Sequence, residues 1–237
     1  MDTIENRLQA VKSRIASACR SAARDPRDIV LVAVSKSFPA ADIGAAHAAG
    51  QRDFGENHVQ EALAKLAALG DRDLVWHFIG PLQNNKTRPV AERFDWVHSI
   101  DRLKVAERLA AQRPEPLPPL QVCVQVNVSG EASKSGVAPG EAPALAHAVA
   151  GLPRLRLRLR GLMTIPEPTS DAALQRQRFA TLRSLKERLV REGLALDTLS
   201  MGMSDDLEAA IAAGATMVRV GTAIFGPRQS SGTANPR

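Results

Sequence analysis

The sequence predicts an α/β protein, a single (β/α)₈ TIM-like barrel preceded by one extra N-terminal helix. Three observations predict this fold: an unbroken β-branched strand near the start, short apolar segments alternating with helical stretches, and room for eight such units in 237 residues. A continuous apolar run is typical of a parallel strand that helices cover on both faces. Alternating strands and helices indicate parallel pairing with right-handed crossovers, and eight units fit a compact barrel.

The predicted elements follow in chain order. A helix is expected over residues 4–18, where apolar side chains recur at helical spacing, and Pro26 and Asp28 interrupt it before the first strand. Strands are expected at residues 29–34, 52–54, 75–79, 96–100, 120–128, 157–164, 198–201 and 217–220. Helices are expected between them at residues 40–49, 59–69, 86–93, 103–112, 139–150, 171–192 and 205–213.

The domain organisation that follows is simple. Residues 1–226 form one predicted domain, and the small, polar residues 227–237 form a predicted flexible tail. A doubly wound open sheet is the alternative, because several of the predicted strands are short. The absence of a G-x-G-x-x-G motif after any strand argues against that alternative.

Composition excludes several classes of protein. The net charge of +6 raises the question of nucleic acid, but aromatic residues make up only 3% and the basic residues are scattered among acidic ones. Base-stacking platforms are therefore scarce, and we predict no nucleic-acid binding. No run approaches the ~18 apolar residues of a membrane span, and the start lacks a secretory signal. With Cys19 and Cys123 read as buried free thiols, we expect a cytoplasmic protein without membrane contact.

Lys36 stands at the end of the first predicted strand, where barrel proteins place their functional residues. A lysine at the edge of a buried strand is costly unless it is paired, extends its amine to solvent or has a lowered pKa. Partial desolvation leaves more of the nucleophilic free amine, which a carbonyl-trapping lysine needs. Lys36 is therefore a candidate Schiff-base lysine, and extension into solvent is the alternative.

The last two units contain residues suited to a phosphate group. Ser204 is expected to cap the helix that starts with Asp205 and Asp206, and Gly221 and Thr222 follow the last strand. Barrel phosphate sites commonly use the loops after the seventh and eighth strands. The carboxylates of Asp205 and Asp206 are then expected to point into solvent. A helix cap and a turn without any ligand explain the same residues equally well.

Arg219 lies within the last predicted strand, on the face opposite Val218 and Val220. A permanently charged guanidinium in this position needs an acceptor. The sequence leaves two possibilities open: a bound ligand, or an ion pair with Asp53 or Glu56. Other strand ends are polar too, among them His77, for which a satisfied core histidine is the commoner outcome.

Several segments together resemble the pyridoxal phosphate homeostasis proteins, single-domain relatives of the alanine racemase N-terminal barrel. The segments are Ala33-Val34-Ser35-Lys36, Phe54-Gly55-Glu56-Asn57, the stretch from His77 to Lys86, Gly161-Leu162-Met163-Thr164-Ile165, the stretch from Leu199 to Asp206 and the stretch from Val218 to Gly226. They extend over nearly the whole chain. One departure is the alternating Arg-Leu run of residues 154–160, which is longer than the segment that usually precedes the motif beginning at Gly161.

The resemblance implies a barrel that binds pyridoxal 5′-phosphate (PLP), with Lys36 forming the internal aldimine and Arg219 meeting the pyridine nitrogen. Members of this family bind PLP without established enzymatic activity and are implicated in storing, delivering or buffering it. The resemblance therefore implies a non-catalytic homeostasis protein with PLP-dependent apo-enzymes as recipients. An arginine at the pyridine nitrogen keeps the ring unprotonated, which makes PLP a weak electron sink.

The resemblance also assigns the remaining cofactor-binding residues. Ser204, Gly221 and Thr222 would hold the phosphate, and Asn57 and Ser200 would lie near the ring or the phosphate. No catalytic residue and no metal ligand follows from it.

Two other functions remain as alternatives. A PLP-dependent amino-acid racemase needs a second acid/base opposite the lysine, which related racemases supply as a tyrosine from an additional β-domain. This chain contains no Tyr and ends where that domain would begin, so we expect no racemase and a monomer. The third possibility is an unrelated barrel enzyme in which Lys36 forms a Schiff base with a sugar phosphate.

Overall fold

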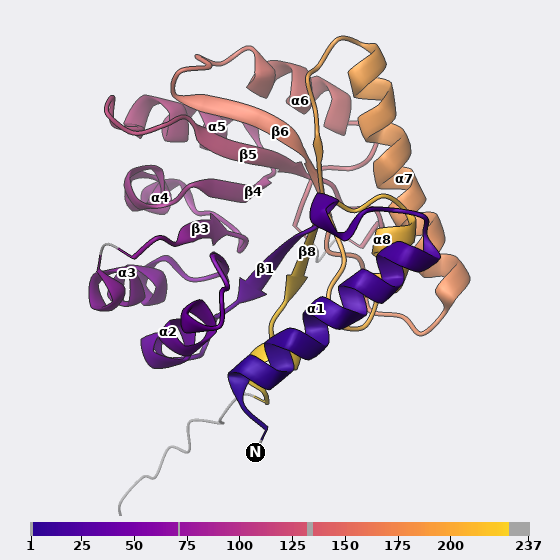
Figure 1. The fold of residues 1–237 in the computed structure, drawn as a ribbon. Helices are drawn as coiled ribbons and strands as arrows, with labels where there is room; N and C mark the ends of the chain where they lie inside the picture. The colour runs from indigo at the N-terminus through magenta and orange to yellow at the C-terminus, as the bar shows by residue number, and fades with distance from the viewer. Residues whose placement is uncertain (1, 71, 132–134, 228–237) are drawn as a thin grey trace, which may run out of the picture.

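The computed structural model describes residues 2–70, 72–131 and 135–227, which form a closed barrel of parallel strands (Figure 1). The strands follow one another in chain order, and the last pairs with the first. They are β1 (Val30–Val34), β2 (Asp53–Glu56), β3 (Val75–Phe78), β4 (Trp96–Ile100), β5 (Leu120–Gln125), β6 (Leu157–Met163), β7 (Thr198–Ser200) and β8 (Met217–Val220). The predicted barrel is confirmed, and the open sheet is wrong because β8 pairs with β1 and closes the sheet.

Helices cover the outside of the barrel. They are α1 (Ile4–Ser21), α2 (Ala40–Ala48), α3 (Val59–Leu69), α4 (Thr87–Arg93), α5 (Leu103–Gln112), α6 (Ala142–Ala150), α7 (Ala172–Arg191), α8 (Leu207–Ala212) and α9 (Thr222–Phe225), with 3₁₀ turns η1 (Pro26–Asp28) and η2 (Asn84–Lys86). The predicted elements are confirmed, with ends that differ by up to three residues, whereas α9 was not predicted. The predicted tail lies outside the described residues, apart from Pro227.

The extra N-terminal helix fills a gap in the outer layer. Within the described residues, the last strand is followed only by the short helix α9, and α1 packs beside α8 and α9 along the outside of the barrel (Figure 1). Arg7 secures this position, because its Nε donates to the carbonyl oxygen of Ile224 at 2.7 Å. The buried stripe of α1 includes Leu8, Val11 and Ile15, as the helical spacing predicted.

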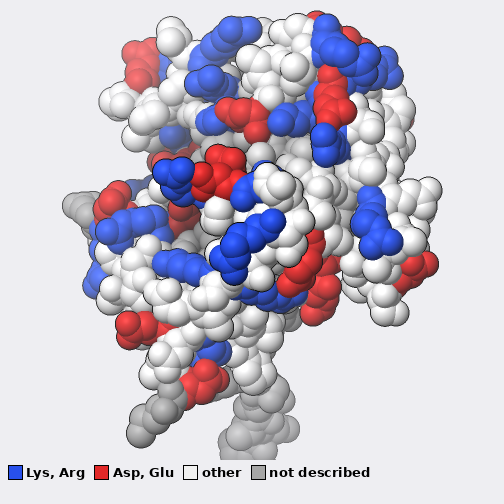
Figure 2. Space-filling model, turned by 45° about the vertical axis from the view of Figure 1, so that its right-hand side comes forward, with Lys and Arg blue, Asp and Glu red and all other residues white. Residues whose placement is uncertain are grey.

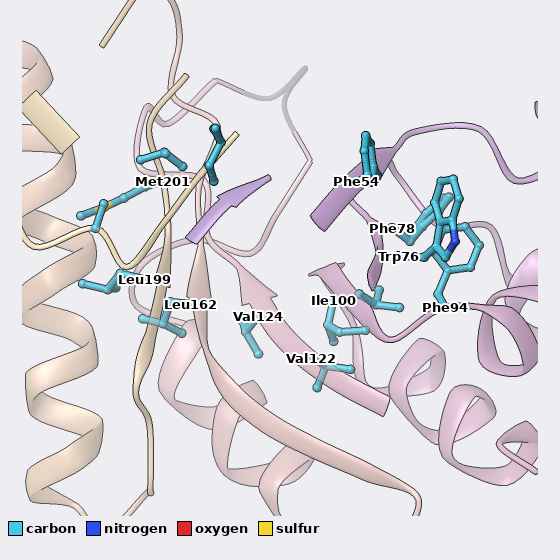
Figure 3. Packing of buried hydrophobic residues seen from close by; sticks show 14 of the residues in the cluster. Phe54, Trp76, Phe78, Phe94, Ile100, Val122, Val124, Leu162, Leu199 and Met201 are labelled. Atoms are coloured by element: carbon cyan, nitrogen blue, oxygen red, sulfur yellow. The ribbon is translucent and has the colours of Figure 1, made fainter. Parts of the chain in front are cut away.

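The core lies in two layers. Between strands and helices, a large apolar cluster includes Phe54, Trp76, Phe78 and Phe94, which pack together in Figure 3. Inside the barrel a smaller cluster holds Trp96, Cys123, Met163 and Met217. Both cysteines are buried and free, as predicted, and burial raises the pKa of the Cys123 thiol to about 12. The apolar interior leaves few positions for polar side chains, so those that it does contain need partners.

Charged side chains of both signs share the surface of the barrel. On the face shown in Figure 2, basic and acidic side chains are interspersed. On this face the mixing leaves no broad basic stripe of the kind that follows a phosphate backbone. Exposed ion pairs, such as Arg183 with Glu187, also occur in the structure. Among the described residues, no helix is long and apolar enough to cross a membrane.

Candidate functional site

A cavity of about 410 Å³ opens at the C-terminal rim of the barrel. Parallel strands bring their carboxyl ends to one rim, so residues that are far apart in the chain meet there. The predicted site residues all line the cavity except Ser200. The lining consists of Val34, Lys36, Asn57, Ile79, Ile165, Met203, Ser204, Asp205, Arg219, Gly221 and Thr222.

Lys36 lies in a tight turn directly after β1. The N–H of Phe38 donates to the carbonyl oxygen of Ser35 at 3.1 Å, and Ser37 has the left-handed φ of 68°. A residue other than glycine, asparagine or aspartate rarely adopts this conformation, so neighbouring contacts must hold it. Lys36 itself is half-buried at the cavity.

A buried ionic cluster holds this turn from behind. Lys65 of α3 donates from Nζ to the carbonyl oxygen of Ser35 at 2.7 Å, to Glu56 Oε1 at 2.7 Å and to Glu61 Oε1 at 2.6 Å. Glu61 also accepts the backbone N–H of Ser37, and Glu56 accepts the hydroxyl of Ser35. The cluster therefore fixes the residues on both sides of Lys36.

The electrostatics of the cluster follow from burial. Burial raises the pKa of Glu56, although hydrogen bonds from Lys65 and Ser35 oppose the shift. Glu61 is more exposed; burial raises its pKa, but the bonds from Lys65 and Ser37 outweigh that effect and the pKa is lowered. The positive charge of Lys65 is therefore shared between a fully buried carboxyl group and a partly exposed one.

Asn57 follows β2 and reaches the cavity because Gly80 makes room for its backbone. A Cβ at Gly80 would lie 2.3 Å from the carbonyl oxygen of Asn57, so only glycine fits there. The Oδ1 of Asn57 is buried and has no hydrogen-bond partner within the described part of the chain. A buried acceptor of this kind points to a missing ligand donor or water.

Two loops complete the rim. The loop after β7 carries Ser204, and Gly221 and Thr222 form the start of α9 after β8. The expected cap at Ser204 is wrong, because α8 begins at Leu207 after Asp206. The prediction that Asp206 points into solvent is wrong too: its Oδ1 accepts the N–H of Met203 at 2.5 Å. Asp205 is exposed at the rim, as predicted.

Arg219 is buried at the base of the cavity. Its Nη1 donates to Ser200 Oγ at 2.6 Å, and its Nη2 donates to the carbonyl oxygen of Thr164 at 2.8 Å. The alternative of an ion pair with Asp53 or Glu56 is wrong, since both carboxylates have other partners. Burial lowers the pKa of Arg219 to about 10, partly offset by the charge of Asp206. Ser200 thus reaches the site through Arg219.

Sequence reasoning missed the cluster around Lys65 and the partner of His77. In α3 the buried positions are Val59, Ala62, Lys65 and Leu69, which recur at helical spacing. A lysine on the buried face of an amphipathic helix was therefore a readable signal. His77 is indeed a satisfied core histidine: it is fully buried and bonds to His98 at 2.9 Å.

Comparison with known proteins identifies relatives of the whole chain. The family model of the alanine racemase N-terminal domain matches residues 7–229. The pyridoxal phosphate homeostasis protein of Pseudomonas aeruginosa is 62% identical over 235 residues, covering 99% of this chain and 100% of the relative. The protein of the same name from Escherichia coli K12 is 54% identical and covers 98% of this chain and 99% of the relative.

Solved structures agree. PipY of Synechococcus elongatus, determined with PLP bound, is 40% identical, with a TM-score of 0.82 over 94% of this chain and 100% of PipY. An alanine racemase from Corynebacterium glutamicum shares the fold at 18% identity and a TM-score of 0.68, over 95% of this chain but 62% of the racemase. The chain therefore belongs to the alanine racemase N-terminal domain family and, within it, to the pyridoxal phosphate homeostasis proteins.

Proposed function

We propose that this protein binds PLP in the rim cavity and stores, delivers or buffers it without substantial catalytic turnover. The observation that carries the proposal is the meeting of Lys36, Arg219 and the two small-residue loops in one cavity. Relatives named for PLP homeostasis match almost the full chain at 54–62% identity. PipY, which covers the same barrel, has a solved structure with PLP bound.

The cavity residues fit the cofactor. PLP supplies an aldehyde that condenses with a free amine to form a C=N link and release one water. Its pyridine nitrogen accepts a hydrogen bond, and its phosphate needs donors and space near the backbone. The volume of about 410 Å³ lies in the range of small-ligand pockets. The unpartnered Oδ1 of Asn57 and the absence of a Cβ at Gly221 suit a polar guest.

Each residue then has a defined task. Lys36 provides the amine that tethers PLP, and Arg219 donates to the pyridine nitrogen. Ser204, Gly221 and Thr222 hold the phosphate, Asn57 binds the ring or phosphate, and Ser200 supports Arg219. Because an arginine donor leaves the ring nitrogen unprotonated, this site stabilises a substrate carbanion poorly and suits retention better than turnover.

Borohydride trapping tests the covalent tether. The purified, PLP-loaded protein is expected to show a visible absorbance band that borohydride removes, and peptide mapping should place the reduced cofactor on Lys36. Lys36→Ala should lose both the band and the trapped adduct, whereas Lys86→Ala, at a lysine outside the cavity, should keep them. Trapping at another lysine in the Lys36→Ala variant would contradict the assignment.

The same preparation separates the carrier from the two enzymes. No steady-state interconversion of D- and L-alanine is expected, and robust racemisation would refute the carrier function. A colourless protein that borohydride traps only after a carbonyl substrate is added would instead indicate the sugar-phosphate enzyme.

Two isosteric substitutions at the rim should act in opposite directions. Thr222→Val removes a donor to a charged phosphate and should weaken PLP binding by roughly tenfold. Asp205→Asn removes a negative charge from the rim and should tighten binding about two- to fivefold at low salt, with a smaller gain in high salt. Dissociation constants from absorbance titrations at two salt concentrations check both. If both substitutions changed the dissociation constant in the same direction, the proposed position of the phosphate at this rim would be contradicted.

We propose that the protein acts in the cytoplasm as a monomer and passes PLP to PLP-dependent apo-enzymes. The open position of the cavity at the rim supports such transfer, since a recipient can approach it directly.

A further inference from the structure

A chain of polar side chains crosses the interior of the barrel and ends at Arg219. Its members come from five different strands: Asp53 of β2, His77 of β3, His98 of β4, Ser200 of β7 and Arg219 of β8. The successive contacts measure 3.0, 2.9, 2.7 and 2.6 Å. Every contact lies within hydrogen-bond distance, so the chain is continuous.

The chain connects the two ends of the barrel. His77, His98 and Ser200 are fully buried, and Arg219 is 3% exposed. The Asp53 side chain is 27% exposed and lines a second cavity, of about 400 Å³, with Lys12 and Arg52. That cavity lies at the N-terminal ends of β1 and β2, opposite the rim cavity. Asp53 therefore meets solvent at the end of the barrel that is remote from the proposed PLP site.

The hydrogen-bond partners assign one direction to the chain. An ionised Asp53 only accepts, so Nε2 of His77 carries a proton and Nδ1 of a neutral His77 accepts from Nε2–H of His98. Nδ1 of His98 then accepts the hydroxyl proton of Ser200. The oxygen of Ser200 is left to accept from Arg219. In this arrangement each of the donors and acceptors along the chain is used.

The reverse direction is worse. If Nδ1–H of His98 donated to Ser200, the Ser200 oxygen would receive two donors and its hydroxyl proton would lose its acceptor in the chain. A buried hydroxyl without an acceptor is unfavourable, because it loses its hydrogen bond to water and gains none in the protein. Charging His98 would also place a cation beside Arg219. Burial, together with His77 and Arg219, lowers the pKa of His98 well below its ordinary value, in agreement with a neutral ring.

We infer that Asp53, His77 and His98 are positioning residues for cofactor retention: they orient the Ser200 hydroxyl, which holds Arg219 in place for the pyridine nitrogen. This inference rests on the proposed PLP site. Arg219 lacks a carboxylate partner among the described residues, so its geometry depends on Ser200 and on the carbonyl oxygen of Thr164. A group at the far end of the barrel thereby controls the donor at the cavity.

The tautomers provide a test that does not need PLP. Two-bond ¹H–¹⁵N spectra of the cofactor-free protein distinguish Nδ1–H, Nε2–H and charged imidazoles, and His77→Gln and His98→Gln identify the two signals. We expect the Nε2–H tautomer at both residues near pH 7.5. An Nδ1–H or a charged ring at His98 would overturn the direction assigned above.

Substitution of Asp53 tests the effect on retention. Asp53→Leu removes the acceptor and should speed PLP release from the loaded protein about tenfold, whereas Asp53→Asn keeps an acceptor oxygen and should stay within about twofold of the unsubstituted protein. Both variants should be compared with Val122→Ala, which removes buried apolar volume from a residue that is not part of this hydrogen-bond chain. Equal release from Asp53→Leu and from a Val122→Ala protein of the same thermal stability would overturn the inference.

The outcomes also separate this inference from the proposed function. If borohydride places PLP on Lys36 but Asp53→Leu retains it normally, the positioning role is refuted and the site stands. If PLP is trapped at another lysine, the proposed site fails, whatever tautomers the spectra give.

Discussion

Lys65→Met should lower the free energy of unfolding by about 3–5 kcal/mol. The substitution removes the cation of a buried ionic cluster and leaves the carboxylate of Glu56 without a compensating charge. The Lys65 side chain is 7% exposed and that of Glu56 is fully buried. The methionine fills the stem of the lysine, so the loss comes from the charge and its hydrogen bonds. Denaturant unfolding of the apo-protein measures it.

The same substitution should loosen the turn that carries Lys36. Without Lys65, the carbonyl oxygen of Ser35 and the carboxylate of Glu61 lose a shared donor, and the left-handed φ of Ser37 is less well held. PLP binding is therefore expected to weaken together with stability. Absorbance titration of the variant measures this second effect.

Two comparisons make the prediction specific. Lys65→Met combined with Glu56→Gln removes the orphaned charge and should recover part of the lost stability. Arg183→Met breaks an exposed pair with Glu187 and should cost no more than about 0.5 kcal/mol. Equal losses of unfolding free energy in the Lys65→Met and Arg183→Met variants would contradict the predicted contribution of the buried cluster to stability.

Acidification should destabilise the protein through His98. Burial, assisted by the neighbouring His77 and Arg219, lowers the pKa of His98 well below its ordinary value near 6.5. Between the lowered pKa and 6.5, the unfolded chain binds a proton that the folded protein does not. The free energy of unfolding therefore falls as the pH drops below about 6.5, with a limiting slope of about 1.4 kcal/mol per pH unit until the lowered pKa is reached.

Glu56 acts in the opposite direction, so a comparison is needed to isolate His98. Burial raises the pKa of Glu56, and the folded protein then gains stability as that carboxyl group is protonated. His98→Gln retains Glu56 and removes the histidine, so the difference in slope between the two proteins belongs to His98. Urea unfolding from pH 7.5 to 5 measures both slopes.

The protonation of His98 can also be measured directly in the unsubstituted protein, so the test does not depend on whether the variant folds. In the unsubstituted protein, the ¹⁵N signals of His98 should remain those of a neutral ring at pH values well below 6.5. Protonation of His98 in the folded protein near pH 6.5 would contradict the prediction.

Local patterns in the sequence determined the fold and most of the cavity. The apolar run of β1 and the alternation after it predicted the barrel, and parallel strands must bring their carboxyl ends to one rim. Five of the cavity residues follow strands, so the fold alone brings them together at this rim. They are Lys36, Asn57, Ser204, Gly221 and Thr222. The resemblance then supplied the cofactor, which periodicity and spacing alone do not specify.

Tertiary structure alone decided the partners of the charged groups. Arg219 bonds to Ser200 and Thr164 where the sequence allowed Asp53 or Glu56. Asp53 connects to Arg219 only through His77, His98 and Ser200. A hydrogen bond depends on distances of a few tenths of an ångström between side chains on different strands. Register, strand tilt and rotamers set those distances together, and they become defined only when the barrel closes.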